Sequence, residues 1–73
     1  MRDKFIKAMI KKYEAEIDVA KATLDVYLDK YVGIVEHPQF AIEIDKQLEI
    51  IGCATDKLRV IEKHYPSDDD IPF

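Results

Sequence analysis

The sequence predicts an all-α protein in which two long antiparallel helices form a hairpin, and two hairpins pair into a dimeric four-helix bundle. Apolar residues recur every three or four positions through two long segments, which is the period of a helix buried on one face. One short link, bounded by Gly33 and Pro38, separates the two segments. With 73 residues, one cysteine and two histidines, the chain has neither a disulfide nor a zinc site to stabilise a small core, so we expect a second copy to complete it.

The first predicted helix covers about residues 2–32. Two interleaved series of residues repeat every seven positions, which is the heptad pattern of helices that pack side by side. They are Ile6, Tyr13, Ala20 and Tyr27 in one series and Ile10, Ile17, Leu24 and Tyr31 in the other. No glycine or proline interrupts this segment, so we expect one continuous helix.

The link covers residues 33–37, and the second predicted helix runs from about 38 to 65. Gly33 suits the left-handed position after a helix C-terminus, and Pro38 suits the first position of the next helix. The second apolar stripe consists of Phe40, Ile44, Leu48, Ile51, Thr55, Leu58, Ile61 and Tyr65. Pro66 ends the helix because it has no N–H to donate. Since the link is short, we expect antiparallel neighbours, in which residues whose numbers sum to roughly 70–74 lie side by side.

Residues 1–65 thus form one helical domain whose core and dimer contacts come from the two stripes. We assign to these contacts Ile6, Ile10, Tyr13, Ile17, Leu24, Ile44, Leu48, Ile51, Leu58 and Ile61. Further apolar residues flank the stripes and would stay exposed in a lone hairpin, which favours pairing of two hairpins. These are Met9, Val19, Val26, Leu28, Ile42, Ile50 and Val60.

Small residues lie midway along both helices, where we expect the backbones to approach closely. Ala20 and Ala22 face the level of Gly52, Cys53 and Ala54. A glycine inside a helix costs about 1 kcal/mol relative to alanine, so a packing role for Gly52 is one interpretation. The other is a tolerated glycine on an exposed face. We expect Cys53 to be a small packing residue rather than a reactive thiol.

Charge and composition disfavour several classes of function. A net charge of −4 and a pI near 5.0 disfavour a dedicated binder of duplex DNA or RNA. No apolar run approaches the roughly 18 residues of a membrane span, no secretory signal is evident, and the lone cysteine favours a reducing cytoplasm. We find no nucleophile–base pair, glycine-rich phosphate loop or carboxylate cluster, so we predict no enzyme activity, no cofactor and no metal. His37 and His64 lie at element ends and are interpreted as surface or capping residues.

The start of the first helix is rich in cations, with one acid, Asp3, among them. The cations are Arg2, Lys4, Lys7, Lys11 and Lys12. With Phe5 and Tyr13 nearby, one interpretation is contact with single-stranded DNA through phosphates and stacked bases. The favoured interpretations are a solvated face, or a docking site for the acidic tail of a neighbouring chain.

Residues 66–73 form a tail that we expect to be disordered on its own. Its last six residues are Asp68, Asp69, Asp70, Ile71, Pro72 and Phe73. This hexapeptide resembles the extreme C-terminus of bacterial single-stranded-DNA-binding proteins, the acidic tip that recruits genome-maintenance proteins. The resemblance covers six of the 73 residues. The helical body does not resemble that family, because the family's oligonucleotide-binding barrel is absent.

The resemblance implies partners that read such tips, namely helicases, nucleases, recombination mediators and replisome subunits, and it does not imply DNA binding. Phe73 combines an aromatic ring with the α-carboxylate, and an apolar pocket with an Arg or Lys at its lip binds both. Pro72 stiffens the approach, Ile71 fills a second shallow site, and the three aspartates meet a basic rim. The alternatives are a solvated acidic tail and a tip appended by design.

We therefore interpret the protein as a small cytoplasmic adaptor or decoy, of phage or other mobile-element origin, that engages the partners of single-stranded-DNA-binding protein. A homodimer would display two tips, either to one receptor with two pockets or to two receptors that it bridges. Two other hypotheses stay open: a Rop-like structural or nucleic-acid-binding bundle with an incidental tail, and an accessory subunit that packs on another polypeptide. The sequence does not distinguish recruitment from inhibition, nor does it identify the receptor.

Overall fold

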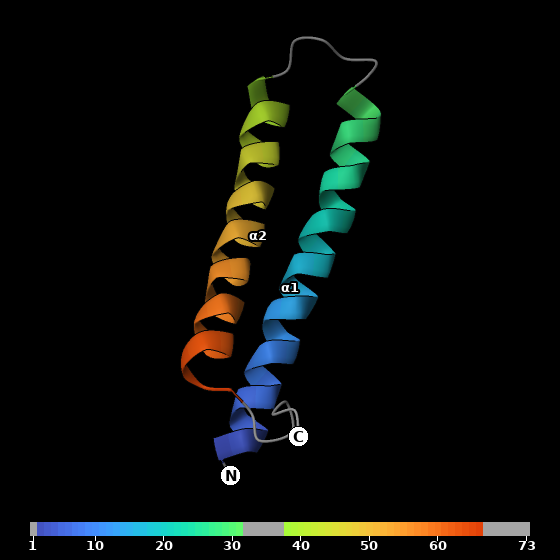
Figure 1. Cartoon of the computed structure of the whole chain (residues 1–73). Helices are drawn as coiled ribbons and strands as arrows, with labels where there is room; N and C mark the ends of the chain where they lie inside the picture. The colour runs from blue at the N-terminus through green and yellow to red at the C-terminus, as the bar shows by residue number, and fades with distance from the viewer. Residues whose placement is uncertain (1, 32–37, 67–73) are drawn as a thin grey trace.

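The computed structural model describes residues 2–31 and 38–66 of the chain (Figure 1). Two helices make up almost all of these residues: α1 is Arg2–Tyr31 and α2 is Pro38–His64. They run antiparallel and side by side, and within the described ranges there is no strand. The prediction of an all-α helical hairpin is confirmed. The predicted link, residues 33–37, and all but Pro66 of the predicted tail lie outside the described residues.

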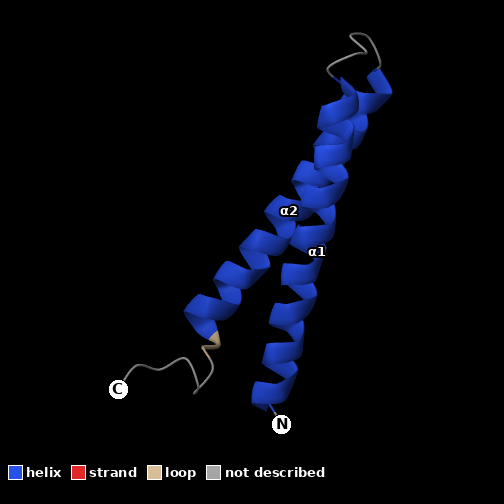
Figure 2. Cartoon of the chain, turned by 90° about the vertical axis from the view of Figure 1, so that its right-hand side faces the viewer, coloured by secondary structure: helices blue, strands red, loops and turns tan. Residues whose placement is uncertain are grey.

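The helices end close to the predicted positions. Helix α2 stops at His64, one residue before the expected end, although the Tyr65 N–H still donates a hydrogen bond of 2.8 Å to the Ile61 carbonyl oxygen. Pro66 follows, and it cannot continue the helix because it lacks an N–H. Figure 2 shows that the two helices overlap near the link in one view and diverge toward the start of α1, so they are inclined to each other.

The contact between the helices buries little. Among the residues whose side chains the structure describes, three apolar ones are buried: Tyr13, Ala20 and Ala54. The other predicted core residues are half-buried, with one exception, and these are Ile6, Ile10, Ile17, Leu24, Ile44, Ile51, Leu58 and Ile61. No large side chain among the described residues is fully buried. A single hairpin therefore lacks the enclosed core that stabilises a small domain.

The exception is Leu48, which is 51% exposed. The spacing of apolar residues predicted that Leu48 and Thr55 follow Ile44 and Ile51 on the contact stripe. In the structure Thr55 is half-buried, as its place on the stripe predicted, whereas Gln47 is half-buried in place of Leu48. Ala54 is the buried residue of its turn, so the contact follows an alternation of four and three residues. Heptad geometry thus places a glutamine in the contact and leaves a leucine outside it.

Three ring contacts fix the register of the hairpin. The rings of Tyr27 and Phe40 meet edge to face with centroids 5.7 Å apart. At the other end of the helices, the Arg2 guanidinium carbon lies 5.8 Å from the centre of the Tyr65 ring. In both pairs the residue numbers sum to 67, slightly below the expected 70–74. Between them, the Lys57 ammonium lies 5.2 Å from the centre of the Tyr13 ring, a pair that sums to 70.

Close packing midway along the hairpin involves the alanines alone. Ala20 is 2% exposed and Ala54 is 1% exposed, whereas Ala22, Gly52 and Cys53 are exposed. A Cβ atom added to Gly52 would meet nothing within 4 Å. Within the hairpin, Gly52 thus fits the second interpretation, a tolerated glycine on an exposed face, and the packing role predicted for Cys53 is wrong. The reason is angular, because neighbouring residues of a helix point about 100° apart and only Ala54 of this group points at α1.

Replacing Gly52 with alanine is expected to stabilise the protein by about 0.5–1 kcal/mol, because the position is helical and has room for a methyl group. Urea unfolding followed by circular dichroism at a fixed protein concentration measures the change. A loss of stability in Gly52→Ala would contradict the expectation, and it would mean that another chain approaches the backbone closely at this point.

Candidate interaction site

The site predicted from the sequence, Asp68 to Phe73, lies outside the described residues, as does His37. The structure does describe the base from which residues 67–73 depart. This base is the end of α2 together with Pro66, and it lies beside the first turns of α1 (Figure 1). Its geometry determines at which end of the hairpin a tip would be presented.

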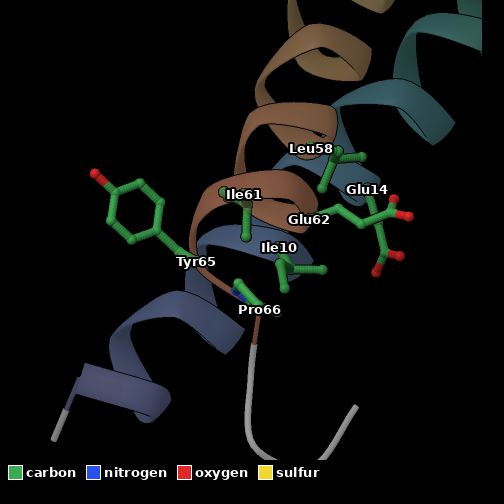
Figure 3. Close-up of a pocket in the computed structure, with 7 residues that line it drawn as sticks. All are labelled: Ile10, Glu14, Leu58, Ile61, Glu62, Tyr65 and Pro66. Carbon is green, nitrogen blue, oxygen red and sulfur yellow. The ribbon is translucent and has the colours of Figure 1, made fainter. Parts of the chain in front are cut away.

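A hollow of about 550 Å³ lies at this base, between the two helices (Figure 3). It is lined by Ile10, Glu14, Leu58, Ile61, Glu62, Tyr65 and Pro66. Figure 3 shows the apolar side chains of Ile10 and Ile61 close to Pro66 and the two glutamates on the opposite side of the hollow from Tyr65. The hollow has an apolar floor and an acidic edge, so it does not offer the cationic lip that an acidic tip would require.

Aromatic contacts hold the end of α2 against α1. The ring of Tyr65 points away from the hollow, and it lies near Arg2 on one helix and near His64 on its own. The His64 and Tyr65 ring centroids are 6.4 Å apart at an interplanar angle of 60°. Cation–π contact at an exposed position contributes about 0.5–1 kcal/mol. The contact between Arg2 and Tyr65 thus favours a position of the α2 end beside the start of α1.

The five N-terminal cations do not form one patch. Lys4, Lys7 and Lys11 share one face of α1, because their spacing of three and four residues places them on adjacent turns. Arg2 and Lys12 point elsewhere. Lys12 lies 3.7 Å from a Glu16 carboxylate oxygen and 5.4 Å from the centre of the Tyr13 ring. The structure therefore places three of these cations on one face of α1 and directs Arg2 and Lys12 toward the rings of Tyr65 and Tyr13.

The structure also bears on the cysteine, on metal ligands and on membrane spans. Cys53 carries an unpaired thiol and is exposed. Among residues 2–31 and 38–66, no three His, Cys, Asp or Glu side chains gather where they would hold a metal ion. Within the same residues, neither helix contains a stretch long and apolar enough to cross a membrane.

Most of the apolar side chains that flank the two stripes are exposed, as the sequence predicted for a lone hairpin, and Phe5 is exposed as well. The most exposed of them are Phe5 at 67%, Val19 at 66% and Ile42 at 64%. A second hollow, an open groove of about 600 Å³, is lined by Lys12, Ala15, Glu16, Val19, Ala20, Gln47 and Ile50. Ala15 and Gln47 were not assigned to any contact from the sequence, and Phe5 was considered there only for contact with single-stranded DNA. The repeat of alanine every seven residues, at positions 8, 15 and 22, could have indicated from the sequence that Ala15 lies on a second contact face of the helix.

Comparison of the chain with protein families, curated proteins and solved structures finds no match. Function is therefore inferred from the residues and from where the helices place them.

Proposed function

We propose that this protein is an adaptor or decoy that presents Asp68–Phe73 to proteins that normally bind the tip of bacterial single-stranded-DNA-binding protein. The observation that carries the proposal is the order of residues in that hexapeptide: three aspartates, then Ile71, Pro72 and Phe73. An acidic tail that served only as a solvated surface would need the carboxylates and would not need two large apolar side chains behind them.

The chemistry of the hexapeptide matches a pocket with an apolar floor and a cationic lip. Burial of the Phe73 ring contributes about 1.5–3 kcal/mol, and in the tip that this hexapeptide resembles the terminal carboxylate adds charge-assisted hydrogen bonds from Arg or Lys. Pro72 restricts the backbone and lowers the entropy lost on binding. The aspartates raise the association rate with a basic surface, so binding should weaken as salt is added.

The described structure supports a role in display. Pro66 is exposed at one end of an elongated hairpin that measures 52 Å along its longest axis. Seven residues, 67–73, follow Pro66, and a chain of that length reaches on the order of 20–25 Å when extended. That reach is enough for the last residue to enter a receptor pocket while the helices stay outside it.

The proposal includes a homodimer, a four-helix assembly of two hairpins. It is supported by the exposed apolar residues of both helices and by the absence of a fully buried large side chain in the described part of the chain. We place the protein in the cytoplasm, where a reducing environment preserves an exposed thiol such as that of Cys53. Two copies would display two tips on one scaffold, which raises the local concentration of tips near a receptor.

Capture of partners from a bacterial lysate tests the proposal. We expect the full chain to retain tip-reading helicases, nucleases or recombination mediators, and the chain that lacks Phe73 to lose them. A free peptide of sequence DDDIPF should displace the captured proteins, whereas a peptide with the same residues in scrambled order should not. Capture of the same proteins with and without Phe73 would contradict the proposal.

A further inference from the structure

A second apolar seam runs along α1 beside the face that contacts α2. Its residues are exposed and repeat at alternating intervals of three and four: Phe5, Ala8, Lys12, Ala15, Val19, Ala22 and Val26. This is the spacing of the contact with α2, rotated by about 140° around the helix axis at about 100° per residue. We call these seven residues the outer seam. Six of them are apolar, so α1 has two faces built for helix packing, and the hairpin uses one of them.

The outer seam is continuous with the open groove between the helices. Ala15 and Val19 belong to both, and Ile50 of α2 borders the groove on the other side. Val19 is 66% exposed and Val26 is 52% exposed in the single chain. Apolar side chains aligned over several turns favour burial against another apolar helix.

Charges beside the outer seam indicate which helix covers it. One flank carries Lys4, Lys11, Asp18 and Asp25, all exposed, so it is basic toward the start of α1 and acidic toward its end. In an antiparallel pair of identical helices, this flank faces the same flank of the other copy. Lys4 then meets Asp25 of the second copy, and Lys11 meets Asp18 of the second copy. In both pairs the residue numbers sum to 29, so a single register satisfies them together.

The same register matches large residues with small ones. It brings Phe5 opposite Ala22 of the second copy and Val19 opposite Ala8 of the second copy, which lets the two seams interdigitate. A parallel pair would instead place this flank opposite the other flank of the seam, so neither Lys4 nor Lys11 would meet its aspartate. Charge and shape therefore both favour the antiparallel arrangement.

We propose that the outer seam of α1 packs against the outer seam of α1 in a second copy, antiparallel, with the two-fold axis near residues 13–15. The occupant of this surface is thus the protein itself, and the contact is isologous, because the same residues contribute from each copy. Lys12 Nζ and Glu16 Oε2 lie 3.7 Å apart in one chain. Near the two-fold axis this pair comes close to the same pair of the second copy, so two positive and two negative charges meet there and their sum is zero.

This pairing has a consequence that rests on the proposed function. Tyr65 lies against Arg2, so residues 67–73 leave each hairpin at the level of the first turn of α1. Antiparallel α1 helices put the two departure points at opposite ends of the dimer, about 35 Å apart along the helix axis at 1.5 Å per residue. The dimer is therefore suited to bridging two receptors rather than filling two adjacent pockets of one receptor.

Charge reversal tests the pairing. In Lys4→Glu/Lys11→Glu and in Asp18→Lys/Asp25→Lys, each of the four ion pairs becomes a repulsion, so we expect the Kd of each homodimer to rise about 100-fold at low salt. An equimolar mixture of the two variants restores opposite charges at all four pairs and should form a heterodimer. Sedimentation equilibrium of each variant and of the mixture measures this, and circular dichroism of the mixture shows that both chains fold.

Two control variants match these changes in net charge on α2: Lys46→Glu/Lys63→Glu and Asp45→Lys/Glu49→Lys, at exposed positions. We expect each to keep a homodimer with a Kd within a few-fold of the natural chain. A natural chain that stays monomeric at high concentration, or a mixture that fails to associate, would overturn the pairing. The chain without Phe73 should dimerise normally, so failure of the tip proposal and failure of the pairing give different results.

Discussion

Replacing Phe73 with alanine is expected to weaken binding to an isolated tip-reading protein about 100-fold. The change removes the aromatic ring and leaves the carboxylate in place. Burial of such a ring contributes about 1.5–3 kcal/mol, and each 1.4 kcal/mol corresponds to a factor of ten in affinity. The helices should be unaffected, because residue 73 lies beyond the end of α2. Isothermal titration calorimetry against a receptor identified by capture measures the affinity, and circular dichroism checks the helices.

Extension of the chain by one glycine after Phe73 separates the ring from the carboxylate. If the terminal carboxylate is bound together with the ring, this extended chain should also lose at least tenfold in affinity, although its ring is intact. Asp69→Asn serves as the matched control, and we expect it to slow association modestly and to lower the salt dependence. Unchanged affinity in Phe73→Ala would show that the carboxylates act alone, and the proposed mimicry of the tip would be wrong.

Replacing Ala54 with leucine is expected to destabilise the protein by about 1–3 kcal/mol, because Ala54 is 1% exposed where the helices approach each other. Three additional carbon atoms at this point must push α1 and α2 apart. For a domain of this size, 1 kcal/mol corresponds to about 4–8 °C in the melting temperature. Thermal unfolding followed by circular dichroism at a fixed protein concentration should therefore show a decrease of roughly 5–20 °C.

Ala41→Leu is the matched control for this change, since Ala41 belongs to the same helix and is exposed. Helix propensity barely differs between alanine and leucine, so we expect Ala41→Leu to shift the melting temperature by only a few degrees. Equal effects of the two substitutions would contradict the position of Ala54 in the contact and would require a different rotation of α2.

Local chemistry predicted the helices well. The heptad series of α1 and the absence of glycine and proline within it predicted one uninterrupted helix, and the structure has Arg2–Tyr31. Pro38 and Pro66 predicted the boundaries of α2 to within one or two residues, because a proline suits a helix start and cannot follow a helix interior. The short link predicted antiparallel neighbours, and the contact between Tyr27 and Phe40 bears this out.

The residues of the candidate site could be identified from the sequence because they depend on residue order and not on how the chain folds. Asp68–Phe73 was recognised from residue order alone, and its proposed binding depends on a receptor rather than on the fold of this chain. The structure adds that the end of α2, from which this segment departs, lies at the start of α1, where Tyr65 meets Arg2. The apolar periodicity of each helix does not predict this position, because the position depends on the register between the two helices.

The sequence by itself therefore determined that this protein consists of two antiparallel helices with apolar faces. Only the tertiary structure decided which apolar residues those faces cover, since it buried Ala54, left Leu48 half exposed and gave Gly52 no neighbour. The physical reason is that periodicity places a side chain at an angle around its own helix axis. The rotation of one helix against another is set by the packing of both surfaces at once, and a stripe wider than one contact is compatible with several rotations.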